Sequence, residues 1–179
     1  MNITVYLGAN KTKDPHIRKA AEELGVWIAA NGHTLVYGGS KSGLMGTLAF
    51  AVVENGGKAI GVEPQMFMDK ELQYDDLTEL IVTETMAERK QKMIKMGDAF
   101  IAFPGGTGTL EEISEVMSMV SLGLLGTPCM LYDIDGYYEG LRMQLQKMKE
   151  MGLSSDSRQA GIYFVSSLEE IAEIVAQAE

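Results

Sequence analysis

The sequence has one cysteine, Cys129, among its 179 residues. A single thiol cannot form an internal disulfide, and it cannot supply the thiolates of a cysteine-based zinc site. The two histidines, His16 and His33, flank an expected helix and have no partner at a spacing typical of metal ligands. We therefore expect no bound metal, with Cys129 in the core and both histidines at the surface.

Basic residues and long apolar runs are also scarce. The 15 Lys and Arg residues stand against 25 Asp and Glu residues, which gives a formal net charge of −10. Broad nucleic-acid binding needs a basic face, so this balance argues against DNA or RNA as a partner. No apolar stretch is long enough to cross a bilayer, and residues 1–8 do not resemble a signal peptide. We expect a cytoplasmic protein with no membrane partner.

What the sequence does contain is a regular alternation of short apolar runs and amphipathic stretches. Strands are expected at 3–7, 34–37, 58–62, 80–83, 99–103, 128–132 and 162–165. Helices are expected at 15–30, 44–53, 86–96, from the glycine-rich turn to about 122, at 135–151 and at 168–178. Because strand and helix alternate without a hairpin signal, the pattern predicts an α/β fold, a doubly wound parallel sheet with helices on both faces.

The length and composition predict how this fold is organised. A chain of 179 residues with 46% apolar residues can bury one substantial core. We find no internal repeat and no low-complexity linker, so we expect a single domain over 1–179. The segment 63–76 has no clear period and is expected to form a loop or lid.

The most informative segment is the glycine-rich turn at 104–109, between the expected strand at 99–103 and a helix. Its glycines and threonines are Gly105, Gly106, Thr107, Gly108 and Thr109. Such a turn lets backbone N–H groups approach a phosphate, and the helix N-terminus adds partial positive charge. A turn that needs glycine only for its geometry is the simpler alternative. A second glycine turn, Gly38-Gly39, follows another expected strand and favours phosphate binding.

Two carboxylates, Glu111 and Glu112, lie in the first turns of the helix after this segment. Acidic residues at that position often only complement the helix dipole. A carboxylate beside a bound sugar phosphate can instead stabilise an oxocarbenium-like centre or activate water. Adjacent helical residues point about 100° apart, so we expect one of the two to face a ligand.

A third element is the expected helix that begins at Met86. Lys92 and Lys95 are explained by a solvated helix face. Arg89 and Lys90 lie in the first turns, close to the end of a strand. A planar guanidinium suits a phosphate or a nucleobase edge, so these two residues are candidate ligand contacts. The methionines after the glycine-rich turn, Met117 and Met119, are expected to fill the core, with a subunit interface as the alternative.

Together these motifs resemble the LONELY GUY family, the cytokinin riboside monophosphate phosphoribohydrolases, over nearly the whole chain. The matching motifs are Tyr37-Gly38-Gly39 with Gly43-Leu44-Met45-Gly46, then Glu71-Leu72, Met86-x-x-Arg89-Lys90, Pro104-Gly105-Gly106-x-Gly108-Thr109-x-x-Glu112 and Asp135-Gly136-Tyr137-Tyr138. The chain departs from the family at Ser40, where a third glycine is usual, and at Ala87, where a histidine is usual. Both changes bear on base or sugar preference, and neither affects the expected catalytic pair.

The resemblance implies a Rossmann-like fold and usually a homodimer with sites near the interface. It implies hydrolysis of the N-glycosidic bond of a nucleoside 5′-monophosphate to free base and ribose 5-phosphate. By motif, Arg89 and Glu112 would be the catalytic pair. The expected substrate contacts are Glu71, Lys90, Gly105, Gly106, Thr107, Gly108, Thr109, Glu111, Gly38, Gly39 and Met86.

Our main hypothesis is therefore an enzyme that hydrolyses AMP or an N6-modified AMP without metal or cofactor. Two alternatives stay open: a non-catalytic nucleotide sensor of the same fold, and an enzyme for another sugar phosphate. Relatives have often carried a lysine decarboxylase label. That reaction needs pyridoxal phosphate on a lysine, and no motif here presents such a lysine, so we reject it.

Overall fold

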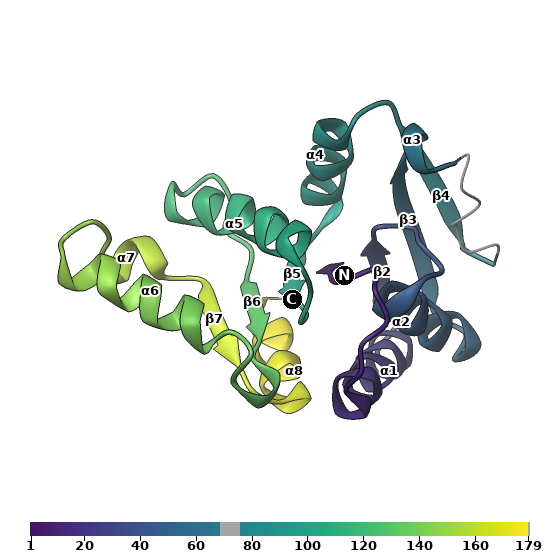
Figure 1. Ribbon diagram of the computed structural model, residues 1–179, viewed down its shortest axis with the longest axis horizontal. Helices are drawn as coiled ribbons and strands as arrows, with labels where there is room; N and C mark the ends of the chain where they lie inside the picture. The colour runs from purple at the N-terminus through teal and green to yellow at the C-terminus, as the bar shows by residue number, and fades with distance from the viewer. Residues whose placement is uncertain (69–75, 179) are drawn as a thin grey trace.

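The computed structural model describes residues 1–68 and 76–178 (Figure 1). Its centre is a seven-stranded sheet of order β4-β3-β2-β1-β5-β6-β7, and every strand pairing in it is parallel. The strands are β1 (Asn2–Tyr6), β2 (Thr34–Tyr37), β3 (Lys58–Pro64), β4 (Glu79–Thr83), β5 (Ala99–Ala102), β6 (Cys129–Tyr132) and β7 (Ile162–Val165). The predicted α/β doubly wound sheet is confirmed.

Helices cover both faces of this sheet. They are α1 (Pro15–Ala30), α2 (Gly43–Glu54), α3 (Gln65–Met68), α4 (Met86–Met96), α5 (Thr107–Ser121), α6 (Glu139–Glu150), α7 (Asp156–Gln159) and α8 (Leu168–Ala178), with a 3₁₀ turn η1 (Ile134–Gly136). Buried side chains of α1, α2 and α8 pack against one face, and those of α4 and α5 against the other. In Figure 1 these two groups of helices lie on opposite sides of the strands.

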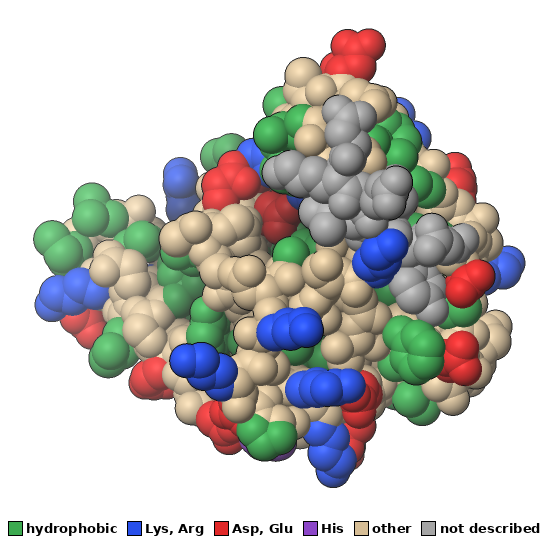
Figure 2. All heavy atoms as spheres, turned by 45° about the vertical axis from the view of Figure 1, so that its right-hand side comes forward, with side chains coloured by type: hydrophobic (Ala, Val, Ile, Leu, Met, Phe, Trp, Pro, Cys, Tyr) green, Lys and Arg blue, Asp and Glu red, His purple; other side chains and the backbone are tan. Residues whose placement is uncertain are grey.

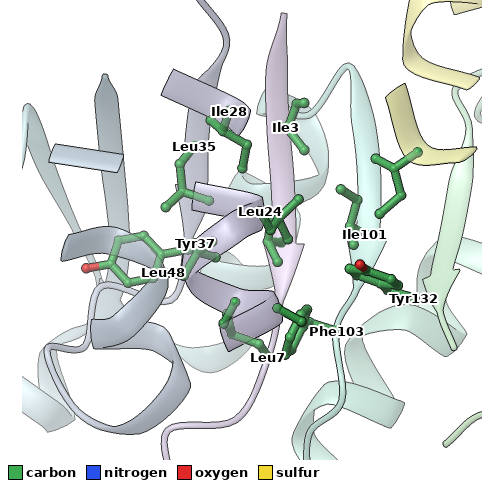
Figure 3. Close-up of a cluster of buried hydrophobic side chains, with 14 of the residues drawn as sticks. Ile3, Leu7, Leu24, Ile28, Leu35, Tyr37, Leu48, Ile101, Phe103 and Tyr132 are labelled. Carbon is green, nitrogen blue, oxygen red and sulfur yellow. The ribbon is translucent and has the colours of Figure 1, made fainter. Parts of the chain in front are cut away.

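The core follows from the alternation of side chains along each strand. Along β1, Ile3 and Val5 belong to the hydrophobic cluster on the α1 side, whereas Tyr6 belongs to the cluster on the α4 side. Figure 3 shows the first cluster, in which Leu24 of α1 and Leu35 of β2 meet the strand residues. Both faces of the central strands are buried, which is why these strands read as continuous apolar runs.

The chain reverses direction across the sheet between β1 and β5. From β1 it builds β2, β3 and β4 on one side, and then it returns to place β5 on the other side of β1. In a doubly wound sheet, the carboxyl ends of the two strands at such a switch point form a ligand crevice. Here those ends bring Gly8 against the glycine-rich turn, because a Cβ added at Gly8 would lie 3.6 Å from Cα of Gly105.

Element boundaries agree with the prediction to within one or two residues except in two regions. The helix expected over 135–151 begins later, at Glu139, because Asp135 and Gly136 have φ of 52° and 74°. Both are left-handed, and an α-helix cannot pass through them. The expected loop over 63–76 contains the end of β3 and the short helix α3. The short helix α7 was not predicted.

The structure corrects one of the two histidine predictions. His16 is exposed, as expected, and its Nδ1 lies 2.7 Å from Oδ2 of Asp135. His33 is only 7% exposed, and its ring lies against that of Trp27 with centroids 5.2 Å apart. The prediction of a surface His33 was therefore wrong. Cys129 and Met117 are buried in the core, as predicted.

The surface is mixed in charge over the face shown in Figure 2. Several Lys and Arg side chains gather in the lower middle of this face, with Asp and Glu side chains beside them. Within the residues described, no helix has the length and apolar character needed to cross a membrane.

The contact between α1 and α2 gives a test of the packing. Gly25 of α1 faces α2, where a Cβ would lie 2.7 Å from Cβ of Ala51 and 2.8 Å from the carbonyl oxygen of Leu48. We predict that Gly25→Ala lowers the free energy of unfolding by about 1–3 kcal/mol, since overpacking outweighs the gain in helix propensity. Urea denaturation measures this change.

Gly140, in α6, is the matched control. A Cβ at this position meets no atom within 4 Å, so Gly140→Ala should leave stability unchanged or raise it by about 0.5–1 kcal/mol. Equal effects of the two substitutions would contradict the close α1–α2 contact.

Candidate active site

A cavity of about 450 Å³ lies over the carboxyl ends of the strands, at the switch point. Its lining comes from four strand ends and from helices α2 to α5. The lining residues are Leu7, Gly8, Ala9, Asn10, Gly38, Ser40, Met45, Glu63, Phe67, Met86, Arg89, Gly106, Thr107, Gly108, Thr109 and Glu112. Among the residues that the sequence motifs singled out, the cavity brings together Gly38, Met86, Arg89, Gly106, Thr107, Gly108, Thr109 and Glu112.

A larger hollow of about 810 Å³ lies on the outer side of α2. Its charged lining residues, of both signs, are Lys11, Arg18, Glu22, Lys41 and Glu54, and all five are exposed to solvent. The interactions of exposed charges are weakened by water and by salt. The smaller cavity holds buried charges, and for that reason we take it as the candidate active site.

The glycine-rich turn forms one end of the cavity. Gly106 is the N-cap of α5 with extended backbone, and no side chain caps this helix. The first N–H groups of a helix have no partner within the helix, so they are available to an anion. Cβ atoms added at Gly106 and Gly108 would meet no atom within 4 Å, which leaves the cavity open above the turn.

Two tyrosines hold the backbone of this turn by hydrogen bonds. The hydroxyl of Tyr137 donates a hydrogen bond to the carbonyl oxygen of Gly105, and that of Tyr138 donates to the carbonyl oxygen of Phe103 at 2.9 Å. Sequence analysis singled out Tyr137 and Tyr138 only as part of a family motif. The structure gives them a physical role, which is to fix the backbone on which the turn is built.

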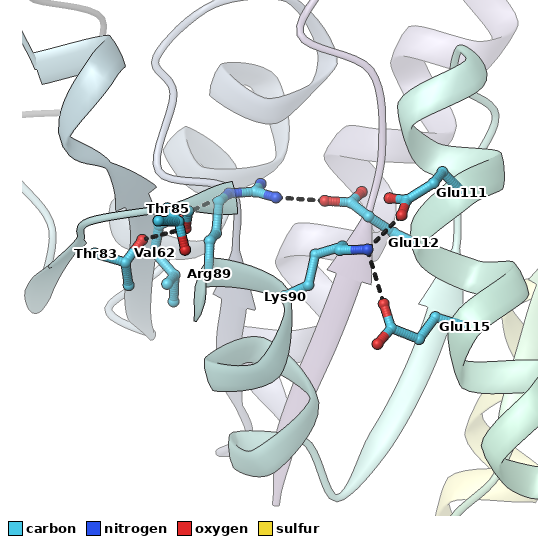
Figure 4. A network of polar contacts seen from close by, with 8 residues as sticks. All are labelled: Val62, Thr83, Thr85, Arg89, Lys90, Glu111, Glu112 and Glu115. Carbon is cyan, nitrogen blue, oxygen red and sulfur yellow. Dashed lines mark hydrogen bonds and ion pairs between the residues drawn. The ribbon is translucent and has the colours of Figure 1, made fainter. Parts of the chain in front are cut away.

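Arg89 and Glu112 form a buried ion pair inside the cavity (Figure 4). Arg89 of α4 is 5% exposed and Glu112 of α5 is 7% exposed. The guanidinium is also held by its Nε, which donates to the carbonyl oxygen of Val62 at 2.9 Å. Gly38 lies so close to Arg89 that a side chain there would displace the guanidinium. These contacts fix both charges in one orientation.

Burial dominates the electrostatics of this pair. It raises the pKa of Glu112 above its ordinary value, and the positive charge of Arg89 only partly offsets the rise. A carboxylate that is costly to keep ionised interacts strongly with any positive charge that develops nearby. Perturbed carboxyl groups in clefts are typical of functional sites.

The neighbouring carboxylate, Glu111, points the other way. It pairs with Lys90, which also contacts Oε2 of Glu115 at 2.9 Å (Figure 4). These acidic partners raise the pKa of Lys90. Glu111 is largely exposed, and none of these three side chains lines the cavity. Of the two adjacent glutamates, only Glu112 lines the cavity.

The remaining predicted residues divide between the cavity and its surroundings. Met86, Thr107 and Thr109 line it. Gly39, with φ of 86°, packs against Glu63, and Gly105 packs against Thr109; neither glycine lines the cavity itself. Glu71, an expected substrate contact, lies outside the described residues.

Sequence reasoning missed several residues of the lining. The most notable is Glu63, which is only 1% exposed and lies at the carboxyl end of β3. Asn10 and Phe67 also line the cavity. A charged residue that ends an otherwise apolar strand was a signal available in the sequence.

The glycine-rich turn provides a test of this geometry. A Cβ at Gly105 would lie 2.8 Å from Cβ of Thr109 and 3.0 Å from the backbone nitrogen of Gly8. We predict that Gly105→Ala lowers the free energy of unfolding by about 1–3 kcal/mol through steric strain. Urea denaturation, followed by circular dichroism, measures it.

Gly108→Ala is the control, because its Cβ would enter open space above the turn. It should keep or slightly raise stability, by up to about 1 kcal/mol, as expected for alanine in a helix. A loss of stability at Gly108 as large as at Gly105 would contradict the described turn.

Comparison with known proteins supports the grouping of these motifs. The family model described as "Possible lysine decarboxylase" matches residues 45–175. The cytokinin riboside 5′-monophosphate phosphoribohydrolase of Rhodococcoides fascians is 38% identical over 169 residues, covering 94% of this chain and 85% of that protein. The enzyme of the same name from Mycobacterium marinum is 37% identical over 174 residues, covering 97% and 92%.

Solved structures agree with the fold. The Moco carrier protein from Chlamydomonas reinhardtii superposes with a TM-score of 0.73 at 22% identity, covering 99% of this chain and 96% of that one. At this identity the likeness concerns the fold alone. The extent and identity of the sequence matches show that the chain belongs to the family of the cytokinin riboside 5′-monophosphate phosphoribohydrolases.

Proposed function

We propose that this protein is a hydrolase that cleaves the N-glycosidic bond of a nucleoside 5′-monophosphate and releases the free base and ribose 5-phosphate. One observation carries the proposal: a buried arginine–glutamate pair lies in the same cavity as an uncapped, glycine-rich helix N-terminus. The names of the relatives from Rhodococcoides fascians and Mycobacterium marinum describe this reaction type.

The 5′-phosphate would bind at the N-terminus of α5. The N–H groups of residues 106–109 are uncapped by side chains, and the hydroxyls of Thr107 and Thr109 add hydrogen-bond donors. The lack of a side chain at Gly38 leaves room for the guanidinium of Arg89 itself. In this pose the ribose lies over Glu112, one helical turn from the phosphate.

Glu112 would then act on the anomeric carbon. As the C1′–N bond breaks, its electrons leave with the base and positive charge develops on the ribose. The Glu112 carboxylate stabilises that charge and orients a water, whose oxygen forms the new bond to C1′. One proton of this water is finally held by the released base. Arg89 keeps Glu112 in place and can contact either the base or the phosphate.

Two further residues, Lys90 and Met86, would act at the entrance of the cavity. Lys90, held by Glu111 and Glu115, contributes a positive charge near the entrance, and Met86 contributes an apolar wall. We propose AMP or an N6-modified AMP as substrate. None of the described residues lining the cavity is a lysine, whereas a pyridoxal phosphate enzyme needs one for its Schiff base.

We also propose that the protein is a cytoplasmic homodimer. Exposed apolar side chains gather around the ends of α5, α6 and α7, where Leu122, Leu124, Met143 and Leu153 are each more than half exposed. Hydrophobic side chains are visible at the left end of Figure 2. Such a surface is typical of a subunit interface. A buried, unpaired thiol at Cys129 fits a reducing compartment.

The dimer proposal has a direct test. Light scattering after size exclusion should give twice the chain mass of 19.5 kDa. Met143→Glu together with Leu124→Glu should shift the mass toward the monomer, because charges are costly in an apolar interface. A monomeric wild-type protein at micromolar concentration would contradict the proposal.

The activity is tested with AMP and isopentenyl-AMP, by chromatographic detection of the free base. Glu112→Gln should lower kcat by about 10²–10³-fold or more while nucleotide binding persists, because the amide keeps the shape but loses the charge. Glu111→Gln, one residue away and outside the cavity, is the matched control and should lose less than about tenfold.

Two results would count against the proposal. If no base is released from any nucleoside monophosphate at high enzyme concentration, the protein is not this hydrolase. If a thermal-shift screen then shows tight nucleotide binding, the alternative of a nucleotide sensor is favoured.

A further inference from the structure

Glu63 is a buried carboxyl group that the mechanism above does not use. It lies at the carboxyl end of β3, is 1% exposed, and lines the cavity. Its Oε2 atom is buried and has no hydrogen-bond partner among the described residues. The nearby positive charge of Arg89 acts on it only through space, without a direct hydrogen bond in the described structure.

An unpartnered buried carboxyl oxygen needs a physical explanation. Buried polar atoms are nearly always hydrogen-bonded, and leaving one unsatisfied costs stability. Burial raises the pKa of Glu63, and Arg89 only partly offsets this. Gly39 leaves room for the Glu63 side chain. It adopts φ of 86°, and a Cβ at this position would lie 3.1 Å from Cβ of Glu63. A ligand that supplies a donor would remove the cost.

The position of Glu63 identifies which part of a nucleotide it would meet. Strands β3 and β5 are separated by β2 and β1, so their ends are three strand spacings apart, roughly 14 Å. The glycine-rich turn follows β5 at one end of the cavity, and Glu63 ends β3 at the other. Arg89 lies between them, because its guanidinium bonds both the carbonyl oxygen of Val62, next to Glu63, and the carboxylate of Glu112.

With the phosphate on the turn and the ribose at Glu112, the base extends toward Glu63. Phe67 of α3, which directly follows β3, lines the cavity, and so does the apolar side chain of Met45. Apolar and aromatic walls suit the faces of a planar base, and a few polar groups then fix its orientation.

We propose that Glu63 recognises the nucleobase, with its free carboxyl oxygen accepting a hydrogen bond from an exocyclic N–H group of the base. This inference rests on the proposed function and defines its substrate class. The substrates are nucleoside 5′-monophosphates of 6-aminopurines, either unsubstituted or carrying one N6 substituent, since both retain an N–H donor. Purines without a 6-amino group, or with two N6 substituents, lack an N–H donor at the 6 position.

Four nucleotides test this rule: AMP, N6-methyl-AMP, N6,N6-dimethyl-AMP and purine riboside 5′-monophosphate. For the wild-type protein, kcat/KM should be about 10- to 100-fold higher for the first two than for the last two, because only these satisfy the buried acceptor. Most of the difference should appear in KM, since Glu63 touches the base rather than the reacting bond. Dissociation constants from calorimetry should follow the same order.

The variants separate recognition from a structural role. Glu63→Leu should abolish the preference, so that the four nucleotides differ by less than about threefold, whereas Glu63→Gln keeps an acceptor oxygen and should retain much of it. Glu79→Leu, at the exposed amino end of β4, is the control and should discriminate as the wild type does. Thermal unfolding checks that each variant is folded.

Two outcomes would overturn the inference. Either the wild-type protein binds and cleaves purine riboside 5′-monophosphate as well as AMP, or Glu63→Leu keeps the wild-type preference. Failure of the proposed hydrolase function gives a different result, namely no free base from any of the four nucleotides. The calorimetric comparison still tests Glu63 in that case, because it measures discrimination without turnover.

Discussion

The buried contact between Arg89 and Glu112 is the interaction on which the candidate site depends. It joins α4 to α5 across the carboxyl ends of the strands, and the hydrogen bond from Arg89 to the carbonyl of Val62 extends the link to β3. A buried ion pair contributes little net stability, because desolvation offsets the attraction, but loss of one partner leaves an uncompensated charge. The pair therefore fixes geometry more than it stabilises the fold. Gly38 permits the approach, because a side chain there would displace the guanidinium.

The fold explains why this pair can exist. At the switch between β1 and β5, two helix N-terminal regions face one crevice, and each brings charged residues in its first turns. Thr85 caps α4 by accepting from the N–H of Glu88 at 3.2 Å, which sets the direction of the turn that carries Arg89. α5 has no such cap, so its first N–H groups remain available. The first turn of α4 is thus capped by a side chain, whereas the first turn of α5 is not.

Much of this arrangement was predictable from the sequence. Strand runs, the parallel sheet and the separation of Glu111 from Glu112 follow from periodicity and helix geometry, which are local. Other features depend on tertiary contacts. The burial of His33 comes from its packing on Trp27, and the left-handed Asp135 breaks a helix that its neighbours favour. The charge of Glu63 at the end of an apolar strand is visible in the sequence, but only the fold shows that this residue is buried and lines the cavity.

The two tyrosine hydroxyls beneath the glycine-rich turn connect distant parts of the chain. Every described residue that lines the cavity precedes position 113, whereas Tyr137 and Tyr138 follow β6. A chain cut after Tyr132 would keep all of those lining residues and lose both supports of the turn. The last quarter of the chain therefore supports the end of the cavity that the glycine-rich turn forms. Insertions between β6 and α6 should displace that turn, although they lie far from it in sequence.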